Sequence, residues 1–477
     1  RAVRRFADVV LVGGGTMKAE GYGPLRARDE DAARREQQGQ AKAPVLAVVS
    51  GSLDLPLGEG SFADSDVTPI VFTTEKADPT KVDDARKRVE VVQLPGEHVD
   101  AATVIDQLHK KGLGRIVCEG GPGLLNQVTE AGLLDEAAQL YRDAVARDEL
   151  KGAVLLVARR GVIVMQEAVG WRHEAYQLPM ERDTIFRMAS NTKPVVATAA
   201  LILQEGGKLS LDDRVATHLD SFDNVRARDI TIQQLLTHAS GFRIGPIFYP
   251  FDEDETPTLL GAVTRFGVEG PEVEPGSSYS YSNAGYNTLG AVIEVASGMP
   301  LEDFLRTRIY EPLGMVDTLN HEDETKLSRM ATVYRGRRQQ DGSVEFRQGF
   351  TPGDPPDFPV VRASGGMIST ATDYARFLQM YLNGGRYADA QIISENSVAA
   401  GTKGYIASSE TTSYGLGWQI AANGAYSHGG SDGTMGWVDP SRELVGMVFT
   451  QSPGGRNPRV EFQQLVNRAV DTGVAEQ

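Results

Sequence analysis

Phe186-Arg187-Met188-Ala189-Ser190-Asn191-Thr192-Lys193-Pro194 is the stretch of this chain that decides its fold. It runs into an apolar segment, Val195 to Gln204, which predicts a helix with Ser190 at its N-terminal end. Lys193 then lies one helical turn further along, on the same face as Ser190. A serine hydroxyl is a weak nucleophile until a neighbouring group takes its proton, and a lysine shielded from water can help to do so. Taken alone, such a pair is more often an N-capping serine followed by a surface lysine.

A second element, Tyr279-Ser280-Tyr281-Ser282-Asn283, lies in a turn-rich stretch before a predicted helix over Asn287 to Ser297. A tyrosine held near a lysine can serve as a general base, a role that suits Tyr281. The amide of Asn283 can fix Lys193 and bond a substrate carbonyl. The alternative is a turn whose tyrosines pack on the core, which we expect of Tyr279 and Tyr286.

A third element is Ser427-His428-Gly429-Gly430-Ser431. Gly429 and Gly430 would let a substrate lie close to the edge of a strand. The backbone N–H groups of Ser431 and Ser190 would form a pair of donors for a tetrahedral oxyanion. The alternative for His428 is a buried structural histidine with its hydrogen bonds satisfied.

In this order, the three elements resemble the serine beta-lactamase and penicillin-binding superfamily, most closely the class C beta-lactamases and the family VIII carboxylesterases. Leu209 to Asp213, Ile230 to Gly241 and Tyr310 to Met315 agree, and the resemblance covers residues 140 to 477. It implies an antiparallel sheet flanked by helices, with a helical domain. It also implies that Ser190 is the nucleophile, that Lys193 and Tyr281 share the base role, and that Asn283 assists them.

The chain departs from this family at His428, where the family usually has a lysine whose charge meets a substrate carboxylate. A histidine is mostly neutral at pH 7, whereas a neutral ester needs no such charge. We therefore expect a serine carboxylesterase that acts on small-molecule esters with short acyl chains. The alternatives are a beta-lactamase or D-alanyl-D-alanine peptidase on the same site, and a non-catalytic binding module.

Residues 1–137 have a different pattern, in which short β-branched strands alternate with helices as in a mostly parallel α/β sheet. Ala7 to Thr16 and Gly114 to Leu125 resemble the C-terminal reductase domain of riboflavin biosynthesis, which has a dihydrofolate-reductase-like fold. The segment is cut at both ends of that pattern, so we expect a partial domain that is not catalytic, and we expect no cofactor for the hydrolase. The alternative for residues 1–137 is an NADPH-binding reductase. Residues 138–477 then form the hydrolase. Exposed sheet edges would need covering, which favours a homodimer.

Composition excludes several classes of function. The formal net charge of −16 disfavours nucleic acid and acidic lipid surfaces as partners. No apolar run of the chain is long enough to cross a membrane, and the N-terminal stretch does not have the pattern of a signal peptide, so the expected location is the cytoplasm. Cys118 is the one cysteine, which excludes an intramolecular disulfide and a cysteine-rich metal site.

Two further patterns need an interpretation. Gly429 to Gly433 matches the Gly-x-Ser-x-Gly elbow of α/β-hydrolases, but no histidine follows Ser431, as that fold requires. His238 and Ser240 are interpreted as turn-forming. The long segments Phe242 to Glu274 and Leu319 to Pro359 are expected to be functional covers or disordered loops. In the first, Phe248, Tyr249 and Phe251 could wall a pocket for the acyl or alcohol group.

Overall fold

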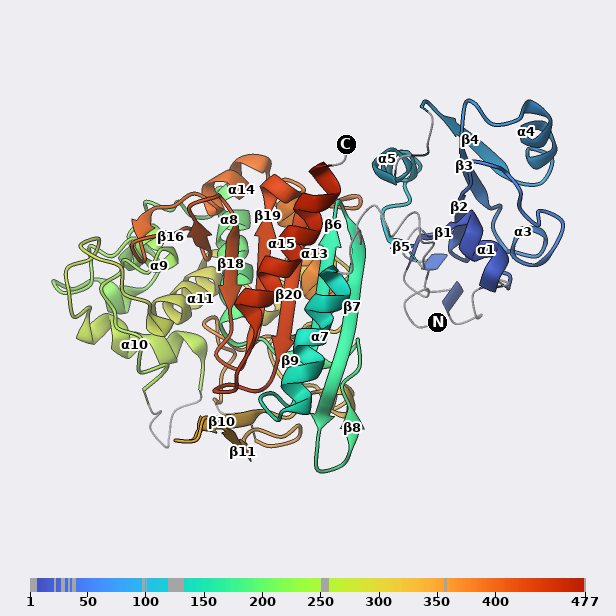
Figure 1. Cartoon of the computed structure of the whole chain (residues 1–477). Helices are drawn as coiled ribbons and strands as arrows, with labels where there is room; N and C mark the ends of the chain where they lie inside the picture. The colour runs from blue at the N-terminus through green and yellow to red at the C-terminus, as the bar shows by residue number, and fades with distance from the viewer. Residues whose placement is uncertain are drawn as a thin grey trace. The chain divides into compact units, whose positions relative to one another are not determined.

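The computed structural model describes residues 7–475 apart from 21–22, 27–30, 33–34, 37–39, 97–98, 100, 119–132, 250–256 and 356–357. Its contacts divide the chain into two compact units (Figure 1). Unit 1 comprises Arg1–Glu136, Ala158–Val164 and Gln463–Gln477, and unit 2 comprises Ala137–Val157 and Met165–Phe462.

Unit 1 contains a five-stranded parallel sheet of order β4-β3-β2-β1-β5. Its strands are β1 (Val9–Gly13), β2 (Val45–Val49), β3 (Ile70–Thr74), β4 (Glu90–Leu94) and β5 (Ile116–Cys118). Alternate residues of β1 enter two separate cores, Val9 and Leu11 in one and Val10 and Val12 in the other. Helices α1 (Gly14–Glu20), α4 (Pro79–Ala85) and α5 (Ala101–Lys110) connect the strands. The predicted parallel α/β sheet is confirmed, while the part of Gly114 to Leu125 that follows Cys118 lies outside the described residues.

The larger sheet has nine strands in the order β15-β16-β17-β18-β19-β20-β6-β7-β8. Its strands are β6 (Gly152–Arg159), β7 (Val162–His173), β8 (Leu178–Pro179), β15 (Ile406–Ala407), β16 (Thr412–Tyr414), β17 (Gln419–Ala421), β18 (Tyr426–Gly429), β19 (Thr434–Asp439) and β20 (Leu444–Thr450). The hairpin β6–β7, which turns at Arg160-Gly161, lies beside the late strand β20. The antiparallel sheet that the resemblance implies is thus confirmed.

Helices cover both faces of this sheet, as neighbouring residues of β19 show. The ring of Trp437 packs edge-on against Phe462 of α15 (Arg459–Ala475), with 6.1 Å between ring centroids. Gly436 faces the other way, where an added Cβ would lie 2.8 Å from the ring of Tyr374 in α13 (Ala371–Leu382). Successive strand residues point to opposite faces, so the two helices lie on opposite sides of the sheet. Figure 1 shows α7 (Leu133–Ala146) on the same side as α15.

A helical region completes unit 2. Helix α8 (Thr192–Glu205) is buried without interruption from Thr192 to Leu203, so it is a core helix rather than an amphipathic one. Helix α11 (Asn283–Ser297) packs against α8, α9 (Ile232–Leu236) and α10 (Leu259–Glu269). This packing brings the start of α11 to the start of α8, where Ser190 and Lys193 lie.

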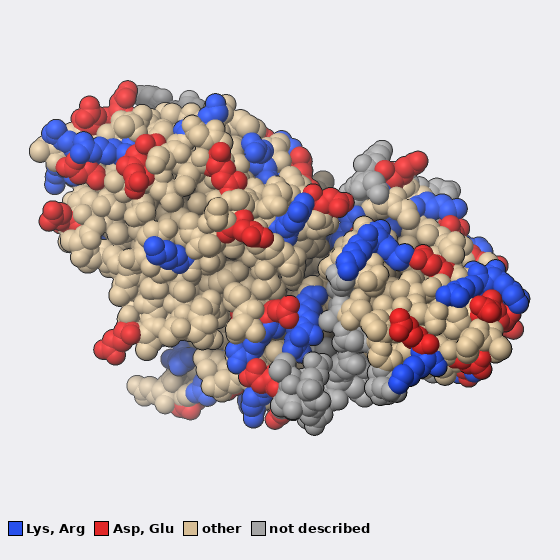
Figure 2. All heavy atoms as spheres, turned by 90° about the horizontal axis from the view of Figure 1, so that it is seen from above, with Lys and Arg blue, Asp and Glu red and all other residues tan. Residues whose placement is uncertain are grey.

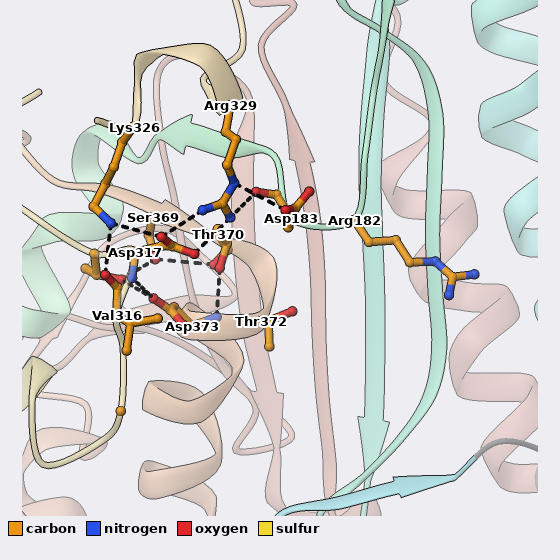
Figure 3. A network of polar contacts seen from close by, with 12 residues as sticks. Arg182, Asp183, Val316, Asp317, Lys326, Arg329, Ser369, Thr370, Thr372 and Asp373 are labelled. Atoms are coloured by element: carbon orange, nitrogen blue, oxygen red, sulfur yellow. Dashed lines mark hydrogen bonds and ion pairs between the residues drawn. The ribbon is translucent and has the colours of Figure 1, made fainter. Parts of the chain in front are cut away.

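A network of ion pairs and hydrogen bonds attaches the second long segment to α13 and to Asp183 (Figure 3). The carboxylate of Asp317 accepts hydrogen bonds from Lys326 Nζ at 2.9 Å and from the two terminal nitrogens of Arg329 at 2.9 and 2.8 Å. Asp373 in α13 accepts the backbone N–H of Asp317 at 2.7 Å. Arg329 also donates to the carbonyl of Asp183 at 2.7 Å. The network therefore joins α13 to the turn before β9 (Ile185–Arg187), the strand that leads to Ser190.

Charged side chains on the face of the molecule seen in Figure 2 are mixed in sign, and no single patch of one sign dominates it. This agrees with acidic residues that are spread along the chain. Within the described residues, no helix has both the length and the apolar character needed to cross a membrane.

Candidate active site

Ser190 lies in a short 3-10 turn, Ala189–Asn191, directly before α8. Ala189 has φ of 46°, in the left-handed region that non-glycine residues seldom adopt. The hydroxyl of Thr192 donates to the carbonyl of Ala189 at 2.7 Å and so holds this turn in place. A strained residue beside a candidate nucleophile is typical of a site whose geometry is imposed by its surroundings.

Lys193 occupies the first turn of α8, and its side chain is fully buried. Its Nζ lies 3.0 Å from Ser190 Oγ, 3.0 Å from Asn283 Oδ1 and 2.7 Å from the carbonyl oxygen of Ser364. Among the described residues, no carboxylate comes within 4.0 Å of this nitrogen. Burial, together with the positive charge of Arg362, holds the pKa of Lys193 well below its usual value. A lysine in this state can lose its proton near neutral pH and act as a base.

Tyr281 covers the other side of the lysine. Lys193 Nζ lies 4.7 Å from the centroid of the Tyr281 ring. Burial raises the pKa of the Tyr281 hydroxyl, while a hydrogen bond with the side chain of Ser190 lowers it by less. The phenol is therefore protonated at rest and lies within reach of the Ser190 hydroxyl.

Asn283 is the first residue of α11, which begins four residues earlier than predicted. The cause is Ser282, whose hydroxyl accepts the backbone N–H of Gly285 at 3.0 Å and caps the helix. The side-chain oxygen of Asn283 accepts from Lys193, and its nitrogen donates to the carbonyl of Ile244 at 3.0 Å. Asn283 thus fixes Lys193, as expected, and also holds the first long segment against the site.

His428 is the penultimate residue of β18, and its ring is buried. Its Nδ1 lies 2.9 Å from the carbonyl of Gly429, which can only accept, so Nδ1 carries a proton. Its Nε2 lies 3.0 Å from the hydroxyl of Tyr414 and accepts from it. Burial and the charge of Lys193 lower the pKa of His428 to about 3, although the bond to Gly429 opposes this. The ring is therefore neutral at physiological pH.

Gly430 and Gly429 differ in their surroundings. A Cβ on Gly430 would lie 2.4 Å from the carbonyl oxygen of Met188 and 2.4 Å from Thr434 Oγ1, whereas one on Gly429 would find its nearest neighbour at 3.4 Å. The absence of a side chain at Gly430 lets β18 approach the residues just before Ser190. Ser431 is exposed at the turn that follows.

Asn191, which the sequence analysis did not single out, joins the Ser190 turn to β18. Its side chain is fully buried, and its amide lies 2.8 Å from Thr434 Oγ1. In the amide orientation that satisfies all its neighbours, its nitrogen donates to the carbonyl of His428 at 2.8 Å and its oxygen accepts the N–H of Gly430 at 3.3 Å. The position directly after Ser190 was the only signal in the sequence that could have pointed to it.

Asn287, one turn beyond Asn283 on α11, was also missed. Its side-chain oxygen accepts the N–H of Ser364 at 3.0 Å, and its nitrogen donates to the carbonyl of Ile247 at 2.9 Å. The carbonyl of Ser364 accepts a hydrogen bond from Lys193. Asn287 therefore supports the lysine indirectly, by holding Ser364 in place. The i, i+4 spacing of the two asparagines was the signal that could have found it.

The aromatic residues of the first long segment have separate places. Phe248 packs edge-on against Phe358 of the second segment, with 5.8 Å between centroids. Tyr249 packs on Phe266 and its hydroxyl bonds Glu269. Phe251 lies outside the described residues. Phe248 therefore joins the two long segments, and Tyr249 attaches the first one to α10.

A family model described as beta-lactamase matches residues 137–469. The chain belongs to the beta-lactamase family. A second model, the RibD C-terminal domain, matches residues 1–141, in agreement with the resemblance of that segment to a riboflavin-biosynthesis reductase. Among the described residues of this beta-lactamase-family protein, no three His, Cys, Asp or Glu side chains are grouped as a metal site.

Two relatives are similar in sequence to this beta-lactamase-family chain. An uncharacterised protein of Mycobacterium tuberculosis (strain CDC 1551 / Oshkosh) is 32% identical over 290 residues, which is 56% of this chain and 70% of that protein. A putative D-alanyl-D-alanine carboxypeptidase of Salmonella paratyphi B is 28% identical over 362 residues, which is 66% of this chain and 82% of that protein.

Two solved structures share the fold of this beta-lactamase-family chain. EstCE1, a hydrolase with promiscuous acyltransferase activity, is 22% identical with a TM-score of 0.61, over 72% of this chain and 99% of that one. The D-amino acid amidase from Ochrobactrum anthropi SV3 is 25% identical with a TM-score of 0.58, over 71% and 99%. At these identities the match to EstCE1 speaks for the fold alone.

Proposed function

We propose that this chain is a serine carboxylesterase that cleaves short-chain carboxylic esters through an acyl-enzyme on Ser190. The observation that carries the proposal is the buried nitrogen of Lys193, 3.0 Å from Ser190 Oγ and without a carboxylate within 4.0 Å among the described residues. A lysine with these neighbours can be a neutral amine, with two N–H groups and one lone pair. The acceptors Asn283 Oδ1 and the Ser364 carbonyl take both N–H groups, so the lone pair faces the Ser190 hydroxyl.

The proposed acylation follows from this arrangement. Ser190 Oγ attacks the ester carbonyl carbon while Lys193 takes the hydroxyl proton. The N–H groups of Ser190 and Ser431 stabilise the oxyanion of the tetrahedral intermediate. Tyr281, protonated at rest, gives a proton to the departing alcohol and regains one from Lys193. Water then attacks the acyl-enzyme, and the same groups move its proton in the reverse sense.

The neutral ring of His428 favours an ester over an anionic substrate. A lysine at this place would offer a positive charge to a substrate carboxylate, whereas the pKa of His428 is lowered to about 3. Its two ring nitrogens are also engaged by Gly429 and Tyr414. A neutral ester requires no counter-charge there.

A peptidase or beta-lactamase is the second candidate. The specific observation in its favour is the 28% identity to a putative D-alanyl-D-alanine carboxypeptidase. Both candidates use the same nucleophile, so they differ in substrate rather than in the first chemical step.

Relative turnover separates the two. We would measure hydrolysis of p-nitrophenyl acetate, butyrate and octanoate beside nitrocefin and a D-alanyl-D-alanine peptide. The ester proposal expects ester turnover to dominate and to disappear in Ser190→Ala. The matched control is Ser277→Ala, because Ser277 is exposed and its hydroxyl bonds the carbonyl of Glu274. Dominant nitrocefin or peptide turnover would favour the peptidase or beta-lactamase over the esterase. Ester turnover that survives Ser190→Ala would overturn the assignment of Ser190 as the nucleophile.

A further inference from the structure

His238 lies just after α9 and is fully buried beneath the site. Its φ of 58° places it in the left-handed region, where histidine, asparagine and aspartate are tolerated better than most residues. This backbone conformation agrees with the turn-forming role expected from the sequence. Its contacts show that it does more than form a turn.

Two hydrogen bonds of His238 bracket Tyr281 in the chain. The backbone carbonyl of His238 accepts the N–H of Ser280 at 2.8 Å. The ring Nδ1 of His238 accepts the N–H of Ser282 at 3.0 Å. One residue therefore holds the backbone immediately before and immediately after Tyr281.

The imidazole also supports the Tyr281 ring. The two ring centroids are 4.2 Å apart with 36° between their planes. Lys193 Nζ lies 4.7 Å from the centroid of the same tyrosine ring. His238 thus holds both the backbone on either side of Tyr281 and the Tyr281 ring, and it keeps that ring in contact with Lys193.

The hydrogen bond to Ser282 determines the protonation of His238. A backbone N–H can only donate, so Nδ1 is unprotonated and the proton is on Nε2. Nε2 is buried and has no hydrogen-bond partner among the described residues. Burial lowers the pKa of His238 well below its usual value, which keeps the ring neutral. The titratable groups around it are Lys193, Tyr279, Tyr281, Tyr286, Tyr414 and His428.

We propose that His238 is a positioning residue that holds the Tyr281 hydroxyl on Ser190, through the bond from the Ser282 N–H to its Nδ1. This inference rests on the proposed function, since it assigns Tyr281 a part in proton transfer. A loosened Tyr281 would lower the rate of the chemical step and leave substrate binding nearly unchanged.

The test compares two substitutions that tolerate the backbone of His238. His238→Asn keeps an acceptor near the position of Nδ1, and His238→Gly removes it; both residues adopt a positive φ. The matched control is His173→Asn, because His173 is also buried, accepts the N–H of Tyr176 at its Nδ1 (3.3 Å) and stacks on a tyrosine ring at 4.3 Å. Tyr176 lies on the β7–β8 hairpin. The control therefore removes the same kind of histidine contact at a place away from Tyr281.

The measurements are kcat and KM for ethyl butyrate, whose alcohol needs a proton to leave, and the rate at which diethyl p-nitrophenyl phosphate labels Ser190. We expect His238→Gly to lower kcat by roughly 10- to 100-fold with KM nearly unchanged, and His238→Asn to restore most of the loss. The labelling rate should change little, because p-nitrophenolate leaves without a proton and Lys193 alone activates Ser190 for this reaction. His173→Asn should keep the kcat of the unmodified protein. Equal loss in folded His238→Asn and His238→Gly, or no loss in either, would overturn the proposal.

A second measurement does not depend on activity. Nitrogen-15 NMR of the imidazoles in the full chain should show two buried histidines, His173 and His238, with Nδ1 bonded to a backbone amide and the proton on Nε2. One of the two signals should vanish in His238→Asn and the other in His173→Asn. A proton on Nδ1 of His238 would overturn the inference even if His238→Gly failed to fold. Absence of Ser190 labelling in the unmodified protein would instead count against the proposed function.

Discussion

Gly430 lies so close to Met188 that a methyl group on Gly430 would stand 2.4 Å from the Met188 carbonyl oxygen. Gly430→Ala therefore has to push β18 away from the residues that precede Ser190. We expect the substitution to lower the free energy of unfolding by about 2 kcal/mol and to lower kcat. Gly429→Ala is the matched control, because its methyl group would find its nearest neighbour at 3.4 Å. Urea denaturation of both variants checks this, and equal stability of the two would contradict the close approach.

The pH dependence of turnover tests the state of Lys193. Burial and Arg362 hold the pKa of Lys193 well below its usual value, and the neutral amine is the base in the proposed acylation. The ester kcat/KM should therefore rise with pH as Lys193 loses its proton and level off well below pH 10. Lys193→Arg should lower kcat/KM by roughly 100-fold or more, because arginine keeps its proton. Lys208→Arg, at an exposed lysine, is the control, and equal activity of the two variants would contradict the prediction.

Two buried histidines should make stability depend on pH. The pKa of His428 is lowered to about 3, and that of His238 is also lowered well below its usual value. Below about pH 6.5 the unfolded chain takes up protons that these folded rings do not. The contribution of these two histidines to the free energy of unfolding should therefore be complete above that pH. It should decrease as the pH is lowered from there toward their pKa values in the folded state.

The measurement is urea denaturation at about pH 8 and about pH 5, on either side of the usual pKa of histidine. Tryptophan fluorescence reports on unit 2, because Trp171, Trp418 and Trp437 all belong to it. His428→Gln should show a smaller loss of stability between the two conditions than the unmodified chain. His109→Gln, at an exposed histidine, should behave as the unmodified chain does. An unchanged loss in His428→Gln would show that this ring is protonated when folded.

Asp317 contributes stability in a lower pH range. Burial raises the pKa of its carboxyl, but the hydrogen bonds from Arg329 and Lys326 outweigh burial, and the net pKa is lowered. Its contribution is therefore complete above the unfolded pKa of aspartate and is lost as the pH falls through the folded pKa. Asp317→Asn should lower the free energy of unfolding by about 2 kcal/mol at neutral pH and by less in acid. Glu324→Gln, at an exposed position of the same segment, should change little by the same denaturation measurement.

The main sheets could be predicted because their strands have a local signature. Val9–Gly13, Val45–Val49 and Ile70–Thr74 are β-branched runs with turn residues at their ends, and they form the parallel sheet of unit 1. The strands β15 and β16 could not be predicted in this way. Ile406–Ala407 and Thr412–Tyr414 are too short for a period of two to appear, and they are strands only because each pairs with a neighbour.

The sequence could predict those residues of the site whose side chains have the proposed chemical roles. Ser190, Lys193 and Tyr281 could be named from their motifs, and the structure brings them together. The carbonyl of Ser364 could not, because every residue has one and this one is 171 positions from Lys193. The role of His238 depends on the amides of Ser280 and Ser282, which only the folded chain brings to it. The homodimer stays a prediction, and light scattering at micromolar concentration would test it.

Asn287 has a consequence for how this enzyme can change its substrate. Its one amide holds the Ile247 carbonyl of the first long segment and the Ser364 peptide that bonds Lys193. Because the attachment on the segment side is a backbone carbonyl, the side chains around Ile247 can be exchanged while the anchor stays in place. Directed evolution of the two long segments is therefore expected to change the side chains around the site while the contacts of Lys193 are kept.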